Sequence, residues 1–201
     1  QFARVDPGTN ANLFDGPADW VSPNPEGGFR DDPPAADGSK VILTDTDHLW
    51  GLGCEKGWVW KSFTRGLNPL LMDPLQPFEG IGDHAQWGRI NHPDHPLWEP
   101  IRLRMGQTRR MADRMDLSAA VPSNDLASTG YCLACPGREY LVYLPDGGEV
   151  TVDLGGATSD LSVEWLDPSD GGERSGGTVK GGEKATLKSP FTDDAVVYLH
   201  R

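Results

Sequence analysis

The stretch Val41-Ile-Leu-Thr-Asp-Thr-Asp-His-Leu-Trp-Gly51 decides how we interpret this chain, because an apolar run passes directly into two aspartates and a histidine. The apolar residues predict a buried strand at about 40–46. Side chains of a strand alternate between its two faces, so we expect Asp45 and Asp47 to point the same way. Carboxylates in such positions usually either take part in catalysis or form a stable structural pair with another side chain.

Composition favours strands and loops over helices. The 201 residues include 25 Gly and 17 Pro, which are the usual residues of turns and loops. A chain of this length forms one large domain or two small ones. We therefore expect mostly β structure with limited helix.

The formal net charge of −12 argues against two classes of partner. Nucleic acids and anionic membranes both require a concentrated positive surface, so we expect neither. No apolar run reaches the roughly 18 residues of a membrane helix, and the first residues lack the pattern of a secretory signal. Neutral polymers such as glycans remain as partners.

The three cysteines, Cys54, Cys132 and Cys135, leave at least one thiol without a partner in the chain. The spacing of Cys132 and Cys135 fits a redox or metal site, but the segment 130–134 has the pattern of a strand. We interpret the cysteines as buried core thiols.

His84, His92 and His95 lie in one predicted loop and are candidate ligands of a metal ion. The spacing of these histidines is irregular and interrupted by prolines, so we interpret them as solvated loop residues. We predict no metal and no cofactor.

The hydrophobic pattern of the chain changes near residue 117, where we expect a domain boundary. Residues 1 to about 40 are dense in Pro, Gly, Asn and Asp, which predicts one long connection within a larger fold. From Glu99 to Asp116 apolar residues recur at helical steps, typical of an amphipathic helix. Beyond Leu117, short alternating runs and Gly-rich turns predict an antiparallel sandwich. The predicted strands there are 139–144, 149–154, 161–166 and 195–199.

The segments Asp45-Thr-Asp-His-Leu-Trp-Gly51, Trp60-Lys-Ser-Phe-Thr-Arg-Gly66 and Asn68-Pro-Leu-Leu-Met-Asp73 resemble the closing part of the apiosidase-like glycoside hydrolases. The tail, at 128–145 and 163–168, resembles the accessory module catalogued as a collagen-binding domain. Together the two resemblances cover nearly all of the chain.

The resemblance implies a fold that is α/β plus all-β. Residues 1–116 would be the C-terminal portion of a (β/α)8 barrel, with the Asp45 strand as the seventh and the region Trp58 to Thr64 leading to the eighth. Residues 117–201 would be a small antiparallel β-sandwich. Such a barrel needs about 250 residues, so we expect its missing N-terminal half to belong to the same polypeptide.

The resemblance also implies a bacterial, secreted or periplasmic protein that hydrolyses the glycosidic bonds of a plant or other complex polysaccharide. Such hydrolysis usually needs two carboxyl groups, roughly 5 Å apart for retention or about 6.5 to 9.5 Å apart for inversion. We predict Asp47 or Asp45 as one of this pair or as a ligand of a sugar hydroxyl, with His48 as a nearby hydrogen-bond partner. In the alternative interpretation, these acids only brace Arg65 and loop amides.

Tryptophans support the carbohydrate interpretation, because flat aromatic faces pack against the C–H faces of sugars. We predict Trp50, Trp58 and Arg65 as substrate-binding residues; for the tryptophans the alternative is core packing. A rival function is a carbohydrate- or matrix-binding accessory module without catalytic activity, and a third is a structural cap for the barrel. Nothing in the sequence indicates the oligomeric state.

Overall fold

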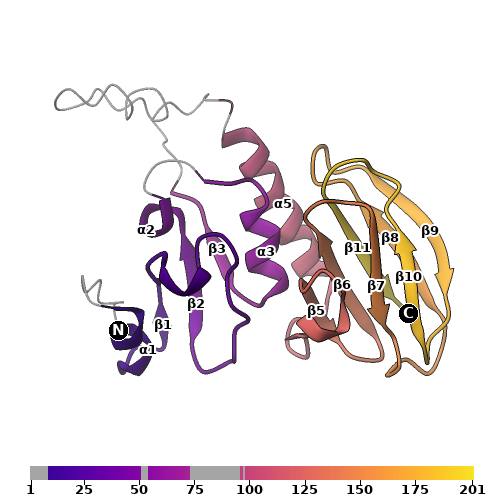
Figure 1. Ribbon diagram of the computed structural model, residues 1–201, viewed down its shortest axis with the longest axis horizontal. Coiled ribbons are helices and arrows are strands. Elements are labelled where there is room, and N and C mark those ends of the chain that lie inside the picture. The colour runs from indigo at the N-terminus through magenta and orange to yellow at the C-terminus, as the bar shows by residue number, and fades with distance from the viewer. Residues whose placement is uncertain (1–8, 51–53, 73–95, 97) are drawn as a thin grey trace.

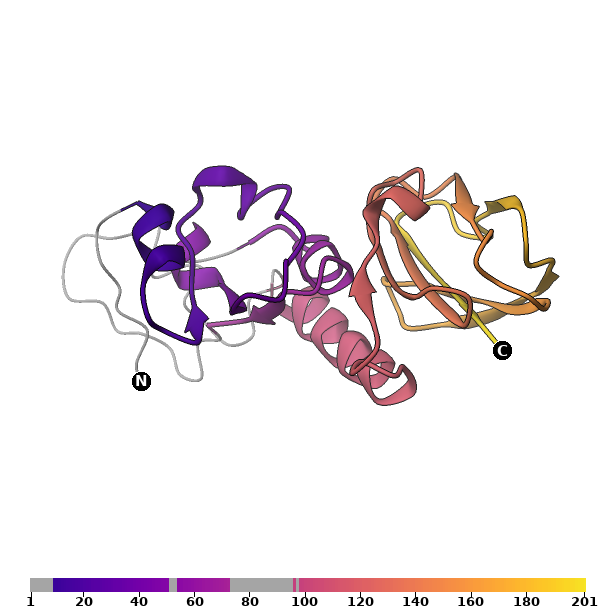
Figure 2. The ribbon, with the colours of Figure 1, turned by 90° about the horizontal axis from the view of Figure 1, so that it is seen from below.

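The structure is a computed structural model that describes residues 9–50, 54–72, 96 and 98–201. Within these ranges the chain is a mixed α/β protein whose strands lie mostly in antiparallel sheets. Three parallel strands lie at one end of the molecule and the antiparallel strands at the other, with helices α3 and α5 between them (Figures 1 and 2). The expected excess of strand over helix is confirmed for the described residues.

The N-terminal part is built on a three-stranded parallel sheet in the order β1-β2-β3. Its elements are α1 (Asn10–Asp15), β1 (Trp20–Val21), the 3-10 helix η1 (Glu26–Gly28), β2 (Val41–Asp45), α2 (Thr46–Trp50), α3 (Trp58–Thr64) and β3 (Asn68–Leu70). Parallel neighbours need a crossover connection, and α3 supplies it between β2 and β3. The strand predicted at 40–46 is confirmed, whereas β1 lies where only a connection was predicted.

Helix α3 ends in a turn that returns the chain to the sheet. Gly66 has a φ of 75°, its N–H donates to the carbonyl of Phe63 at 3.0 Å, and the N–H of Leu67 donates to that of Ser62 at 3.0 Å. This is the Schellman arrangement, which favours glycine because a Cβ is strained at positive φ. A Cβ on Gly66 would also lie 2.8 Å from Pro122 Cγ, so this turn packs closely against the C-terminal part.

Helix α5 (Trp98–Arg114) confirms the amphipathic helix predicted from Glu99 to Asp116. Its buried residues include Ile101 and Met111, as its periodicity predicts, and also Arg104. Charged residues are rarely fully buried unless they are paired. Arg104 therefore requires a partner, which the C-terminal part of the chain supplies.

The C-terminal part contains a six-stranded antiparallel sheet, in the order β4-β5-β6-β11-β8-β9, and a two-stranded sheet of β10 and β7. Its elements are β4 (Val121–Pro122), the 3-10 helix η2 (Asn124–Leu126), β5 (Cys132–Cys135), β6 (Glu139–Leu144), β7 (Glu149–Asp153), β8 (Leu161–Leu166), β9 (Glu173–Val179), β10 (Lys184–Lys188) and β11 (Ala195–His200). Side chains of both sheets, such as Val142 and Val152, share one apolar core. The strands predicted at 130–134, 139–144, 149–154, 161–166 and 195–199 are confirmed as β5, β6, β7, β8 and β11, but β4, β9 and β10 were not predicted.

A second apolar cluster joins the two parts of the chain. Trp60 of α3 and Met111 of α5 pack with Leu141 and Tyr143 of β6. The rings of Trp60 and Tyr143 are stacked, with their centroids 6.4 Å apart. Helices α3 and α5 therefore contact both the parallel strands and the six-stranded sheet.

A buried ion pair lies in the same junction. Nη2 of Arg104 donates to both carboxylate oxygens of Asp194, at 3.1 and 3.2 Å, and the two side chains are 1% and 2% exposed. The hydroxyl of Tyr143 also donates to Asp194, at 2.9 Å. Burying charges costs several kcal/mol per ion unless their geometry compensates. The two parts thus meet through a specific, desolvated interface.

Candidate functional site

The predicted residues Asp45, Asp47 and His48 lie where β2 ends, at the carboxyl edge of the parallel sheet. Strand β3 runs parallel to β2 with Leu70 opposite Asp45, so both strands end at this edge. In parallel α/β folds, ligands and catalytic residues collect outside the carboxyl ends of the strands. The cluster therefore occupies the edge at which a catalytic site is expected.

The expectation that Asp45 and Asp47 point the same way from one strand is wrong. Strand β2 ends at Asp45 and helix α2 begins at Thr46, so Asp47 is helical. Oδ1 of Asp45 accepts a hydrogen bond from the backbone N–H of Asp47 at 3.0 Å, which is the geometry of a helix N-cap. Asp45 is thus half-buried and engaged in the turn, whereas Asp47 is exposed.

His48 is held by Ser22, a residue that the sequence analysis missed. Nδ1 of His48 lies 2.7 Å from Oγ of Ser22, which directly follows β1. The Pro-rich segment around Ser22 predicts only a loop, and it is the parallel pairing of β1 with β2 that brings it beside His48. Within the described part of the chain, Nε2 of His48 has no hydrogen-bond partner.

Trp50 and Trp58 lie side by side but differ in exposure. Their ring centroids are 5.6 Å apart and the rings are nearly perpendicular, at 82°. Trp58 is 1% exposed and belongs to the core of the N-terminal part, whereas Trp50 is half-buried. Because stacking on a sugar needs an open ring face, Trp58 has a packing position and Trp50 is the better placed of the two.

Arg65 lies at the opposite edge of the sheet from the acids. It follows α3 and precedes β3, so it sits near the amino end of that strand. Its Nη1 lies 2.6 Å from Asp32 Oδ1, and its guanidinium lies 4.2 Å from the ring centroid of Tyr131. In the part of the chain that the structure describes, neither Asp45 nor Asp47 pairs with Arg65, so the interpretation that they brace it is wrong.

The Arg65 cluster joins the two parts of the chain. The Tyr131 hydroxyl donates to Asp32 at 2.6 Å, and Nε of Arg65 donates to the carbonyl of Gly130 at 3.1 Å. The hydrogen bond from Tyr131 and the charge of Arg65 together hold the pKa of Asp32 below its usual value, against a smaller opposing effect of burial. Arg65 therefore has a structural position at the junction.

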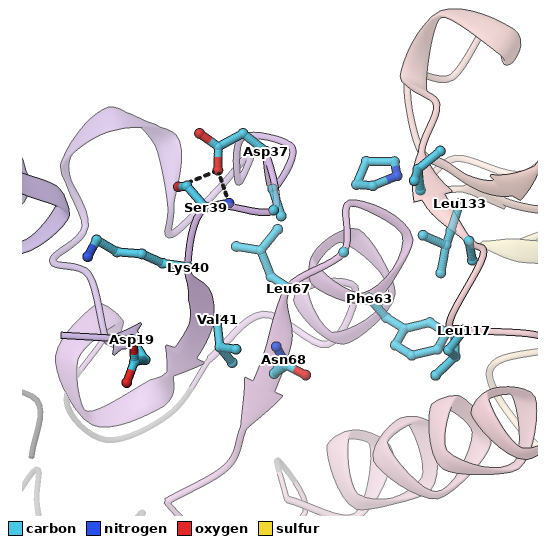
Figure 3. A pocket seen from close by; sticks show the side chains of 16 residues that line it. Asp19, Asp37, Ser39, Lys40, Val41, Phe63, Leu67, Asn68, Leu117 and Leu133 are labelled. Carbon is cyan, nitrogen blue, oxygen red and sulfur yellow. Dashed lines mark hydrogen bonds between the residues drawn. The ribbon is translucent and has the colours of Figure 1, made fainter. Parts of the chain in front are cut away.

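A groove of about 660 Å³ separates the amino ends of β2 and β3 from the C-terminal part (Figure 3). Its apolar lining residues are on both sides and include Val41, Phe63, Leu67, Leu117 and Leu133. Among its polar residues, Asp37 accepts two hydrogen bonds from Ser39, and Lys40 Nζ donates to two backbone carbonyls at 2.8 and 2.6 Å. The groove lies at the edge away from His48, so we keep the carboxyl edge as the candidate site.

The described cysteines and carboxylates give no metal or thiol site. All three cysteines are free and buried, and burial raises the pKa of both Cys54 and Cys132 to about 12. Such thiols stay protonated near neutral pH and are poor nucleophiles or ligands. Among the described residues no group of three His, Cys, Asp or Glu could hold a metal ion; the loop with His84, His92 and His95 lies outside them.

None of the described helices is long and apolar enough to cross a membrane. Helix α5, the longest of those described, carries several charged residues along its length.

Two solved structures of glycoside hydrolases have a similar fold. A glycoside hydrolase family 5 protein from Bacteroides vulgatus has a TM-score of 0.62 and 14% sequence identity, and the match covers 82% of this chain and 42% of that chain. A second structure, described as a glycoside hydrolase, has a TM-score of 0.61 at 14% identity, with 82% and 43% covered. The chain thus spans less than half the length of either protein.

The match extends over both parts of the chain, because neither part alone makes up 82% of it. At this low identity the similarity shows the fold alone, which is glycoside hydrolase-like. No protein-family model and no curated protein matches the sequence.

Proposed function

We propose that this chain is the C-terminal part of a glycoside hydrolase. Residues 1–116 would be the closing portion of a (β/α)8 barrel, and residues 117–201 an accessory β-sandwich. The order β1-β2-β3 of adjacent parallel strands, with α3 as the crossover between β2 and β3, is the repeating unit of such a barrel. The proposal is also supported by the similarity in fold to glycoside hydrolases, over 42% of the first one's length.

The observation that carries this proposal is the cluster of Asp45, Asp47 and His48 at the carboxyl end of β2 in a glycoside hydrolase-like fold. Asp47 is the exposed acid, so we assign it as one carboxyl of the catalytic pair or as a ligand of a sugar hydroxyl. Asp45 orients the turn that presents Asp47, through its hydrogen bond to the Asp47 N–H. Trp50 is the ring best placed to pack on a sugar.

Hydrolysis by this route needs a second carboxyl group on the other side of the scissile bond. Opposed acid and base groups normally reach that bond from different strands, and we assign the second carboxyl to barrel strands outside this chain. The step needs only carboxyl groups and water, so we propose no metal and no cofactor. The chain alone should then be catalytically weak or inactive.

The finer assignments rest on the resemblance in sequence. The segments at 45–51, 60–66 and 68–73 resemble the apiosidase-like enzymes, which supports a plant or other complex polysaccharide as substrate and a bacterial, secreted or periplasmic setting. The tail resembles the module catalogued as a collagen-binding domain, but we assign it a packing role. Arg104 of α5 and Asp194, directly before β11, form the buried pair that supports this role.

The rival function is an accessory module that binds carbohydrate or matrix without catalysis. Binding platforms for sugars usually present flat aromatic faces, yet the tyrosines and the tryptophan of the C-terminal part are all buried: Tyr131, Tyr140, Tyr143, Trp165 and Tyr198. In the intact chain this burial speaks against stacking of sugars on these five rings, of which Tyr140 and Trp165 lie in the core between the two sheets and the other three are covered at the junction with the N-terminal part. Phe191 is half-buried and has the guanidinium of Arg174 over its ring. Saturable binding of a glycan by residues 117–201 alone would favour the rival.

The test compares this chain with the full product of its native reading frame. Release of reducing ends is measured on a panel of soluble plant polysaccharides, with Asp47→Asn, Asp45→Asn and, as a control, the exposed Asp193→Asn. We expect hydrolysis by the full product, a large loss with Asp47→Asn, little loss with Asp193→Asn, and almost none by the chain alone. Robust turnover by the chain that survives both site substitutions would overturn the assignments.

A further inference from the structure

We propose that Ser22 is a positioning residue that fixes the tautomer of His48, so that His48 presents its Nε2–H as a hydrogen-bond donor at the carboxyl edge. The inference deepens the proposed function, because it names the group that would donate to a sugar oxygen there.

The contact joins two half-buried side chains from different elements. Oγ of Ser22, just after β1, lies 2.7 Å from Nδ1 of His48 in α2. This is within the usual range for a hydrogen bond that involves a hydroxyl. The hydrogen bond at Nδ1 determines which ring nitrogen of a neutral histidine carries the proton. This contact therefore decides whether Nε2 is a hydrogen-bond donor or an acceptor.

Either atom of this contact can be the donor, depending on the tautomer of His48. We assign the direction from the partners that the half-buried Ser22 has among the described residues. A serine hydroxyl carries one hydrogen and accepts through its lone pairs. Among the residues that the structure describes, Ser22 Oγ has no hydrogen-bond partner besides His48. If Nδ1–H donated to Oγ, the hydroxyl hydrogen would lack a protein acceptor, whereas donation from Oγ to Nδ1 satisfies both groups. Neutral His48 then carries its proton on Nε2.

A fixed Nε2–H complements the acids beside it. Ionised carboxylates such as Asp45 and Asp47 only accept hydrogen bonds, whereas each sugar hydroxyl both donates and accepts. A site with carboxylate acceptors and one imidazole donor can therefore satisfy neighbouring hydroxyls of a glycan in both directions. The opposite tautomer of His48 would offer a lone pair and leave the site without that donor.

The experiment is long-range proton–nitrogen NMR of the complete chain labelled with ¹⁵N-histidine, at about pH 8, above the ordinary histidine pKa of about 6.5. His48→Gln identifies the His48 signals. We expect the wild type to show a single Nε2–H tautomer with Nδ1 hydrogen-bonded. Ser22→Ala should move both nitrogen shifts toward those of free imidazole, Ser22→Thr should retain the wild-type shifts, and the control Ser39→Ala, at the opposite edge, should change nothing.

An Nδ1–H tautomer in the wild type, or unchanged His48 shifts in a folded Ser22→Ala variant, would overturn the inference. In the full native product, Ser22→Ala should lower kcat/KM by roughly two- to tenfold, the value of one ordinary hydrogen bond, and Ser22→Thr should restore it. If no polysaccharide is hydrolysed although the Nε2–H tautomer is present, the proposed function fails while the positioning of His48 stands.

Discussion

Replacing Asp194 with Asn tests whether the two parts of the chain depend on one another. The substitution keeps the size of the side chain and removes its charge. Arg104 would then remain 1% exposed with no carboxylate partner. Its Nη1 still donates to the carbonyl of Pro100 at 3.2 Å, but its buried Nε has no hydrogen-bond partner in the described chain.

The expected cost follows from the burial of the pair. Removing one partner of a buried ion pair leaves an uncompensated charge and costs about 3 to 5 kcal/mol. Native proteins have a total stability of about 5 to 15 kcal/mol, so Asp194→Asn removes a large share of it. For a chain of this length the melting temperature should decrease by roughly 6 to 20 °C. Combining Asp194→Asn with Arg104→Met should cost less than the sum of the two single substitutions, because no buried charge then remains.

The assay is urea unfolding followed by tryptophan fluorescence and by circular dichroism, with Asp193→Asn as the matched control. Asp193 is the next residue along, its side chain is 69% exposed, and it pairs with Lys56 at 3.2 Å. An exposed pair contributes about 0 to 1 kcal/mol, so the control should hardly change the free energy of unfolding. Equal losses in Asp193→Asn and Asp194→Asn, or a loss below about 1 kcal/mol for Asp194→Asn, would contradict the reasoning.

Two further predictions concern Tyr143 and the turn at Asp45. Burial, reinforced by the negative charge of Asp194, raises the pKa of Tyr143 far above its ordinary value. Above about pH 10 the unfolded chain loses this proton, whereas folded Tyr143 keeps it. The contribution of Tyr143 to stability is therefore full below that pH and decreases by about 1.4 kcal/mol per pH unit above it. In urea unfolding at about pH 9 to 11, the free energy of unfolding should decline less steeply with pH for Tyr143→Phe than for the wild type. Asp45→Ala should lower stability by about 1 kcal/mol through loss of the cap, whereas Asp47→Ala at the exposed neighbour should stay within about 0.5 kcal/mol, as thermal unfolding of the two variants will show.

Sequence patterns predicted the elements whose side chains alternate or repeat on a buried face. Strand β7 and helix α5 have this property, and both are confirmed close to their expected bounds. Strand β9 is exposed at nearly every position and contains two glycines, so it has no apolar alternation to detect. Strand β10 does alternate, with Ala185 and Leu187 half-buried between exposed polar residues, so its pattern is visible in the sequence but rests on only two apolar positions. Strand β9 pairs with β8, the strand directly before it, whereas β10 pairs with β7, which is distant in sequence. Local patterns do not encode the second pairing.

The sequence predicts where the candidate site lies in the chain, but it does not predict the geometry of the site. The position of Asp45 at the end of a buried strand is visible in the sequence, because apolar residues precede it directly. The turn that makes Asp47 helical depends on a hydrogen bond from its N–H to the Asp45 carboxylate, and alternation along a strand does not anticipate it. Ser22 could not be found from its own segment, since only the pairing of β1 with β2 brings it to His48.

The junction links the candidate site to the C-terminal part through helix α3. Its first residue, Trp58, packs edge-on against Trp50, at 5.6 Å between ring centroids, and its third, Trp60, stacks on Tyr143 of β6. The first turn of α3 therefore contacts both the candidate site, through Trp58, and the six-stranded sheet, through Trp60. A shift of that sheet would move α3 and with it the ring that supports Trp50, because close-packed interiors transmit displacement. The C-terminal part therefore has a physical route to influence the site without binding a ligand, which is why we assign it a packing role.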